Sequence, residues 1–229
     1  MVSSLEQLQK VLKISFNDAS LLRKSLIHRS YLNENPEDLT ESNERLEYLG
    51  DAVIGLVVAE KLYMDHPDFD EGRMTRLRSA LVRRETLARV ARSIALGDYL
   101  FLGKGEDSSG GRQKTANLSC AMEAVIAAVY LDQGYSVTAG MIVRLLTDEW
   151  EKAISRPAIT DYKSKLQELI QSQKQRIPSY HVTGTEGPDH IKTFSVEVRL
   201  GDTVLGIGSG KNKKEAEAEA AREALEKLL

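Results

Sequence analysis

Carboxylates stand at Glu44, Glu47 and Asp51 within the segment NERLEYLGDAV, which is followed at once by the apolar run IGLVV. Residues four apart share one face of a helix, so Glu47 and Asp51 should project together. A further acid, Glu123, precedes AVIAAVYL, eight residues without a charge. Because a buried carboxylate is costly without a partner, acids on two apolar helices indicate a cation between them.

Two kinds of cation fit this pattern. An Arg or Lys from a neighbouring helix would give a structural ion-pair network, a common fate of buried acids. A hard divalent ion such as Mg²⁺ would instead be held by carboxylate oxygens, which suits phosphate chemistry. Gly50 adds a constraint, because glycine within a helix costs about 1 kcal/mol relative to alanine. We therefore expect another element to pack closely beside Asp51.

The acids belong to a long helical region. Apolar residues recur three and four apart from Leu5 to about Ala153, with breaks at 33–43, around Pro67, at 96–98 and across GKGEDSSGGRQKTAN. The segment around Glu47 is apolar on most of its circumference and should be largely buried. We predict an all-α first domain over residues 1–154, followed by a short linker at 155–160.

The pattern changes after the linker. DYKSKLQELIQSQKQ has the period of an amphipathic helix, and SYHVTGTEG, TFSVEVRLG and TVLGIGSG have the length and composition of strands. KKEAEAEAAREALEKLL ends the chain as a helix with a stripe of alanines and leucines facing inward. Residues 161–229 are therefore predicted to form an α+β domain with the order α-β-β-β-α, which makes the protein multidomain.

Composition narrows the class of protein. The chain of 229 residues is 41% hydrophobic and has no apolar run of the roughly 18 residues that a membrane span needs. Its start resembles no secretory signal, and the lone Cys120 excludes an internal disulfide, so we expect a cytoplasmic protein with no membrane partner. The net charge of −3 gives no indication of a nucleic-acid partner, which must be argued from local charge.

Local positive charge is found where the last helix begins. Lys211, Lys213 and Lys214 surround Asn212, a suitable N-cap residue. Cations at a helix N-terminus oppose the helix dipole unless an anion is bound there. The lysines therefore form either a phosphate site or a solvated basic turn, and the electrostatic conflict favours the phosphate site.

NERLEYLGDAV is similar to the signature of bacterial ribonuclease III, N-E-[RK]-L-E-[FY]-L-G-D-[AS]. The resemblance extends in order through LIHRSYLNE, DEGRMTRLRSALV, LGKGEDSSGGR and MEAVIAAVYLD, and it covers essentially the whole chain. It implies an all-α endonuclease domain followed by a double-stranded RNA-binding domain, for which the start K-K-x-A of the last helix is typical. It also implies a homodimer in whose cleft each site cuts one strand.

The resemblance carries over a set of catalytic residues. Four acids line each active site of the family, and three match Glu47, Asp51 and Glu123, which are then catalytic residues and ligands of Mg²⁺, for which Mn²⁺ can substitute. At the fourth position Cys120 replaces the usual Asp. A thiol is a poor Mg²⁺ ligand, so Cys120 is expected at the rim of the site, with metal binding kept, weakened or altered.

Other matched residues receive lesser roles. Glu44 and Glu71 match acids that are common in the family, as outer-shell or dimer-contact residues. His28 is expected to be structural. The Gly-Ser segment at 103–111 reads as a solvated flexible connector, or as a contact to substrate phosphates through the cations beside it, Lys104, Arg112 and Lys114.

In the C-terminal domain the resemblance assigns RNA contacts to Gln167, Glu168 and His190, in addition to the three lysines. Such domains recognise the shape of A-form RNA. The predicted function is a Mg²⁺-dependent endoribonuclease that cleaves double-stranded RNA in rRNA and mRNA processing, leaving 5′-phosphate and 3′-hydroxyl ends. The alternatives are a non-catalytic double-stranded RNA-binding dimer, which the missing fourth acid would explain, and a nucleotide phosphohydrolase, which would require histidine ligands near the acids.

Overall fold

The computed structural model describes residues 4–38, 40–155, 161–174, 177–188 and 192–228. The chain divides into two compact units, Met1–Ser155 and Arg156–Leu229. The linker predicted at 155–160 lies outside the described residues except for Ser155, which is the last residue of a helix.

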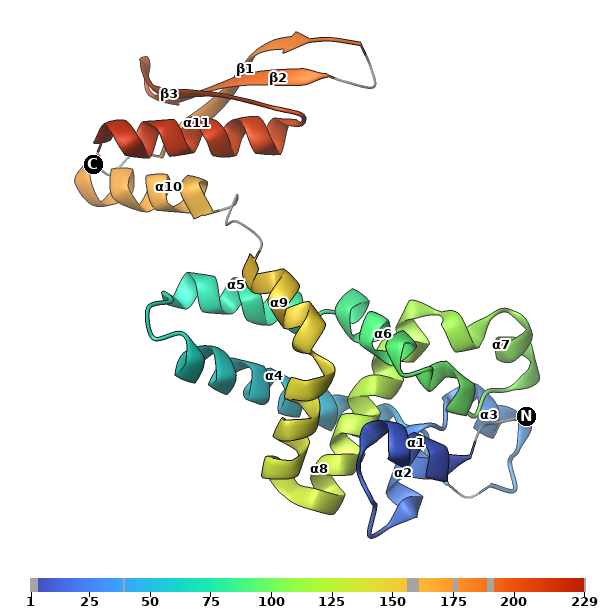
Figure 1. The fold of residues 1–229 in the computed structure, drawn as a ribbon. Helices are drawn as coiled ribbons and strands as arrows, with labels where there is room; N and C mark the ends of the chain where they lie inside the picture. The colour runs from blue at the N-terminus through green and yellow to red at the C-terminus, as the bar shows by residue number, and fades with distance from the viewer. Residues whose placement is uncertain (1–3, 39, 156–160, 175–176, 189–191, 229) are drawn as a thin grey trace. The chain divides into compact units, whose positions relative to one another are not determined.

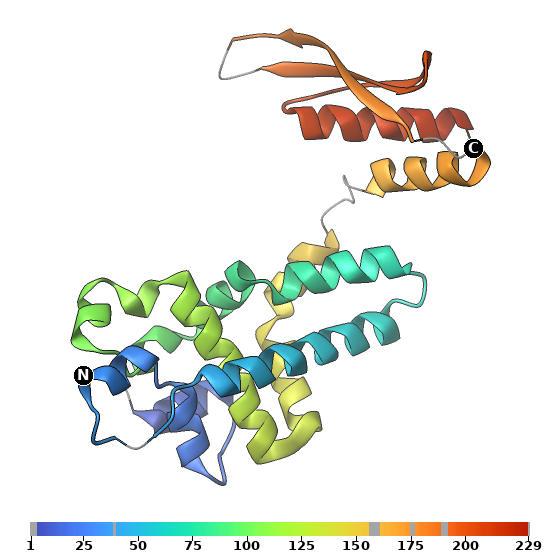
Figure 2. The same cartoon turned by 180° about the vertical axis from the view of Figure 1, so that it is seen from behind.

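The first unit is helical in the part that the structure describes, as the apolar period predicts (Figure 1). Its α-helices are α1 (Leu5–Leu12), α2 (Ala19–Ser25), α3 (Arg29–Glu34), α4 (Glu44–Asp65), α5 (Glu71–Val82), α6 (Arg84–Ser93), α7 (Lys104–Ser108), α8 (Thr115–Leu145) and α9 (Thr147–Ser155). Two 3₁₀ turns, η1 (Leu96–Tyr99) and η2 (Gly111–Gln113), flank α7. Seen from behind, α4 and α5 run side by side as an antiparallel pair (Figure 2).

The two longest helices, α4 and α8, pack against each other. Val53 and Val57 of α4 and Ala121 and Val125 of α8 are buried in one core. A Cβ built on Gly50 would lie 1.8 Å from the backbone carbonyl oxygen of Glu123, a distance that no side chain tolerates. The close packing expected at Gly50 is thus confirmed, and the element that packs there is α8.

The expectation that α4 is largely buried is wrong for one of its faces. Tyr48 is 84% exposed, Leu56 58%, and Tyr63 and Met64 are each 69% exposed. Helical periodicity shows which residues are apolar but does not show whether the same chain covers them. The apolar circumference therefore consists of one face against the core and one face toward the outside of the unit.

The second unit has the predicted element order. Helix α10 (Asp161–Lys174) is followed by strands β1 (Ser179–Glu186), β2 (Thr193–Leu200) and β3 (Thr203–Gly210) and by helix α11 (Lys213–Leu228). The strands form an antiparallel sheet in the order β1-β2-β3. The alternation in TFSVEVRL buries Val196 and Val198 against both helices. Tyr162 and Leu228, which the helical period places on apolar faces, are each 39% exposed.

Strand β3 lies directly on α11 because it carries glycine at alternate positions. Gly206, Gly208 and Gly210 face α11, where an added Cβ would approach backbone atoms of Ala220 and Ala216 within 2.4, 2.1 and 2.6 Å respectively. The alanines of α11 are buried beneath them. The contact between the glycines of β3 and the backbone of α11 therefore sets the position of the helix on the sheet.

A side chain of α11 also reaches the outer edge of β3. The carboxylate of Glu223 accepts a hydrogen bond from the backbone N–H of Ile207. Among the described residues, no helix is both long enough and apolar enough to cross a bilayer.

Candidate functional site

The structure brings Glu47, Asp51 and Glu123 together where α4 crosses α8. Glu47 and Asp51 flank Gly50, the residue that touches the backbone of Glu123. Glu47 and Glu123 are partly buried and Asp51 is exposed. Burial, together with the negative charges of Asp51 and Glu47, raises the pKa of the Glu123 carboxyl to about 7. The three predicted ligands therefore share one electrostatic environment.

None of these three carboxylates forms an ion pair with another residue of the described chain. The guanidinium of Arg84 lowers the pKa of Glu123, but less than burial and the two acids raise it. The ion-pair network that the sequence left open is therefore not formed by the residues that the structure describes. The donors are carboxylate oxygens, which suit Mg²⁺ because this ion binds through one or two carboxylates and keeps several waters.

The carboxylates of Glu47, Asp51 and Glu123 lie near one another but do not form a complete metal-binding site. In the part of the chain that the structure describes, no three Asp, Glu, His or Cys side chains converge on one point as they stand. The effect of the Asp51 and Glu47 charges on the pKa of Glu123 nevertheless shows that the three carboxylates lie near one another.

Cys120 lies on α8, one turn before Glu123. Burial, together with a hydrogen bond to Glu47 and the charges of Glu47 and Glu123, raises the pKa of the Cys120 thiol to about 12. The thiol is therefore protonated at neutral pH. In this arrangement Cys120 is a neutral neighbour of Glu47 rather than an anionic ligand.

Glu44 and Glu71, the two acids outside the proposed ligand set, are the first residues of α4 and α5. Glu44 begins α4, where it is exposed, accepts a hydrogen bond from Ser42 Oγ at 2.9 Å and lies 3.9 Å from Arg29. Glu71 begins α5 and accepts a hydrogen bond from Thr75 Oγ1 at 2.8 Å. It also lines a groove of about 530 Å³ between α4 and α5, together with the exposed Leu56 and Tyr63.

His28 has the structural role that was expected of it. It caps α3, because its Nδ1 accepts from the backbone N–H of Ser30 at 3.3 Å, and Ser30 Oγ in turn accepts from the N–H of Gly103 at 3.0 Å. Burial lowers the pKa of His28, so the ring is neutral at neutral pH.

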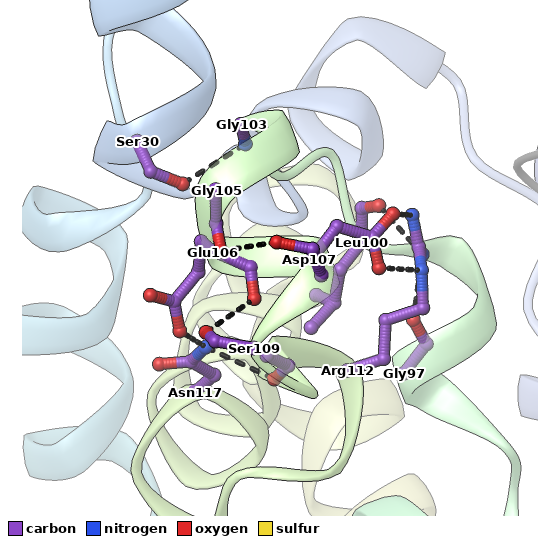
Figure 3. Close-up of polar contacts among 12 residues, drawn as sticks. Ser30, Gly97, Leu100, Gly103, Gly105, Glu106, Asp107, Ser109, Arg112 and Asn117 are labelled. Carbon is purple, nitrogen blue, oxygen red and sulfur yellow. Dashed lines mark hydrogen bonds and ion pairs between the residues drawn. The ribbon is translucent and has the colours of Figure 1, made fainter.

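The Gly-Ser segment is a structured element, and the expectation of a flexible connector is wrong (Figure 3). Arg112 donates two hydrogen bonds of 2.9 Å to Asp107 and also binds the carbonyl oxygens of Gly97 and Leu100. Lys114 forms an ion pair with Glu106 at 2.9 Å. Of the three cations considered as phosphate contacts, two are thus held by acids of the same segment, and Lys104 remains exposed.

The lysines of the second unit surround a capped helix N-terminus. Asn212 Oδ1 accepts from the N–H of Glu215 at 2.9 Å, and the Glu215 carboxylate accepts from the N–H of Lys211 at 3.1 Å. This reciprocal cap orients the turn. Lys211, Lys213 and Lys214 are exposed and form no ion pair within the described residues. Their ammonium groups are available to an anion.

Two of the remaining predicted RNA contacts, Gln167 and Glu168, are exposed on α10. His190 lies outside the described residues.

Comparisons with known proteins agree with both units. A family profile described as "Ribonuclease-III-like" matches residues 18–149, and one described as "Double-stranded RNA binding motif" matches residues 162–228. A protein named Ribonuclease 3 from Dehalococcoides mccartyi is 52% identical over 98% of this chain and 94% of its own length. Another of that name, from Syntrophobacter fumaroxidans, is 45% identical over 97% of this chain and 93% of its own.

A solved structure is similar to the helical unit. It is the nuclease domain of ribonuclease III from Campylobacter jejuni, with a TM-score of 0.59 and 37% identity, covering 66% of this chain and 98% of that one. Its title refers to structural flexibility in a region involved in dimer formation of that domain.

Proposed function

The chain belongs to the ribonuclease III family of endoribonucleases that cleave double-stranded RNA, and we propose that its cleavage site consists of Glu47, Asp51 and Glu123 acting with Mg²⁺. The observation that carries this placement is the close packing of α4 on α8 at Gly50, which sets Glu47 and Asp51 beside Glu123, in a cluster where no described residue forms an ion pair with these acids. A cluster of carboxylates without a cationic protein partner is suited to a divalent cation.

Glu47 and Asp51 of α4 and Glu123 of α8 would hold the cation from two helices that are packed against each other. Bound Mg²⁺ supplies a Lewis acid that activates water near neutral pH and offsets phosphate charge. The water oxygen bonds to phosphorus, the bond from phosphorus to O3′ breaks, and a proton is transferred to the departing oxygen. The products are a 5′-phosphate and a 3′-hydroxyl. Mn²⁺, also an oxygen-seeking divalent ion, is a substitute.

We propose that two copies of the chain associate through the exposed face of α4. Tyr48, Leu56, Tyr63 and Met64 follow one another along this face, and Leu131 of α8 is 52% exposed. Large apolar side chains gathered on one surface mark an interaction site, and a two-fold dimer is the commonest assembly. Two sites in one dimer would serve the two strands of a duplex.

In the C-terminal domain we propose that the three lysines at the start of α11 contact RNA phosphates. Gln167 and Glu168 of α10, with His190, would contact the minor grooves. The proposed setting is the cytoplasm, with structured rRNA and mRNA precursors as substrates.

One experiment tests the site. Long double-stranded RNA is incubated with wild-type protein and with Glu123→Gln, each in Mg²⁺ and in chelator. We expect shortening of the RNA only with wild type in Mg²⁺, and retarded but intact RNA in the other lanes. Retarded and intact RNA in every lane would instead support a binder without catalysis, and full cleavage by the variant would move the site elsewhere.

A further inference from the structure

Gly55 is a glycine of α4 that no contact within the described chain requires. Glycine within a helix lowers stability, because it loses more backbone freedom on folding than any other residue. Gly50 has a packing reason, since a Cβ there would strike the backbone of Glu123. A Cβ at Gly55 would have open space around it for 4 Å, and the backbone there is that of an ordinary helix. The missing side chain therefore leaves free space at the surface of α4.

Gly55 continues the row of acids along α4. Glu47, Asp51 and Gly55 are four residues apart, so they lie on one side of the helix in successive turns. Four residues rise by about 6 Å along a helix axis, which separates each member of the row from the next. Helix α8 touches α4 between the two acids, where Glu123 meets Gly50. The free space at Gly55 thus lies one helical turn beyond Asp51.

This free space is separate from the two hollows of the exposed face of α4. Leu56 and Tyr63 line the groove of about 530 Å³ against α5. Tyr48 and Leu131 line a second hollow, of about 680 Å³, near the start of α4. Gly55 lines neither hollow. The glycine therefore belongs with the row of acids and not with the large side chains that we propose to meet a second copy.

A duplex that is cleaved at these acids needs room beside them. The phosphodiester held by Mg²⁺ is part of a continuous backbone, so the neighbouring sugar and phosphate lie close to the surface that carries the acids. Glycine lets a helix backbone come close to a ligand, because it has no Cβ. A side chain at position 55 would hold the strand away from the acids, and a displacement of about 1 Å from the productive geometry costs on the order of 100-fold in rate.

We propose that Gly55 is the point on α4 where the RNA backbone next to the scissile phosphodiester lies against the protein. The proposal rests on the cleavage site proposed above. Gly55 is then a positioning residue, which sets how closely the duplex approaches Glu47 and Asp51 by having no side chain. Stability and activity should therefore change in opposite directions when a methyl group is added, because alanine favours the helix and obstructs the RNA.

The test compares Gly55→Ala and Gly55→Gln with the same two changes at Gly140. Gly140 is the matched control, because it is also a helical glycine with open space around an added Cβ, and it lies on α8 beyond the break at Gly134. Single-turnover cleavage of a labelled RNA duplex is measured in Mg²⁺ at saturating protein, and thermal unfolding is measured on the same proteins. Alanine at either position should raise the melting temperature by about 2–4 °C.

Cleavage should distinguish the two positions. We expect Gly55→Gln to slow the saturated rate roughly 10- to 100-fold and Gly55→Ala to slow it less, since the loss follows the size of the added side chain. Both Gly140 variants should cleave at the wild-type rate. A Gly55→Ala protein that is more stable than wild type and also slower supports the proposal, because a folding defect would lower stability and rate together.

Other results would overturn the proposal. Wild-type rates in both Gly55 variants, or equal losses in the Gly140 variants, would show that position 55 does not face the RNA. Sedimentation of Gly55→Gln as a monomer, where wild type is a dimer, would assign the glycine to the interface between copies. Normal cleavage by Glu123→Gln would refute the acid site and this role of Gly55 with it. An inactive Glu123→Gln beside fully active Gly55 variants would refute the role of Gly55 alone. If Gly55→Gln does not fold, Gly55→Ala decides the case.

Discussion

Gly50 and Glu123 meet through their backbones, since a Cβ on Gly50 would fall 1.8 Å from the Glu123 carbonyl oxygen. This contact places Glu47 and Asp51, on either side of Gly50, against the helix that carries the third acid. The spacing of acids within α4 follows from helical geometry, whereas their distance from Glu123 depends on one residue without a side chain.

Gly50→Ala should therefore destabilise the protein, by about 3 kcal/mol or more, because α4 or α8 must shift to admit the methyl group. Gly55→Ala is the matched control on the same helix. Nothing lies within 4 Å of a Cβ at Gly55. Alanine there should raise the free energy of unfolding by at most about 1 kcal/mol through its higher helix propensity. Denaturant unfolding of both variants measures the difference. A Gly50→Ala protein as stable as wild type would show that the two helices cross differently.

Glu123→Gln should change how stability depends on pH. The pKa of Glu123 is raised from 4.5 to about 7 in the folded protein, so folding favours its protonated form. The resulting stabilisation is present below pH 4.5 and is lost as pH rises to about 7. Without divalent metal, the variant should gain about 1–2 kcal/mol over wild type across this window, after allowance for partial exposure.

Unfolding of wild type and of Glu123→Gln at pH 5 and pH 8 in chelator measures this effect. Mg²⁺ should then stabilise wild type more than the variant, because a cation offsets the repulsion that the variant has already reduced. A constant difference between the two proteins at all pH values would contradict the raised pKa.

Cys120→Asp should restore a fourth carboxylate beside Glu47 and Glu123. We expect tighter Mg²⁺ binding by calorimetric titration, and cleavage that is unchanged or faster at limiting Mg²⁺, since oxygen is the better donor for this ion. In chelator the variant should be less stable than wild type because it adds a like charge. Cys120→Ser, which keeps a neutral donor, is the control. A clear loss of cleavage in Cys120→Asp would show that Cys120 does not border the site.

Leu56→Asp should dissociate the proposed dimer. The residue lies at the middle of the exposed face of α4, and a charge there opposes burial against a second copy. Sedimentation should report a monomer for this variant and a dimer for wild type. Val11→Asp, at a residue of α1 that is 41% exposed, should leave the dimer intact. A monomeric wild type would refute the assembly directly.

Replacing Lys213 and Lys214 by alanine should weaken RNA binding with little dependence on sequence. Each lost phosphate contact should reduce the slope of log affinity against log salt by about 0.7 to 0.9. Lys227→Ala, at the other end of α11, serves as the control. If the lysine variant and wild type bind RNA equally across a salt series, Lys213 and Lys214 do not contact RNA phosphates.

Much of this architecture could be predicted from the sequence because it depends on local periodicity. The 3.6-residue period places Glu47 and Asp51 on one face, and the alternation in β2 places Val196 and Val198 inside. Relations between distant segments could not be predicted in this way. The Gly-Ser segment has the composition of a flexible loop, yet Glu34, far from it in sequence, accepts the backbone N–H of Lys104 at 2.9 Å.

The same limit explains two other differences. No pattern within α6 indicates that the charge of Arg84 acts on Glu123 of α8, because that relation arises from helix packing. The exposed face of α4 looks like core in the sequence, since an apolar residue has the same character whether its own chain or a second chain covers it.

The bond from Glu223 to the N–H of Ile207 has a consequence for the behaviour of the protein at high concentration. The edge strand of a sheet exposes unpaired backbone N–H and C=O groups. An extended peptide can pair with these groups, so such edges promote aggregation. Here a helix that also begins with the basic turn supplies a carboxylate to the border strand. The helix thus occupies one backbone donor of β3 that an extended peptide would otherwise use, while the lysines at its first turn stay exposed.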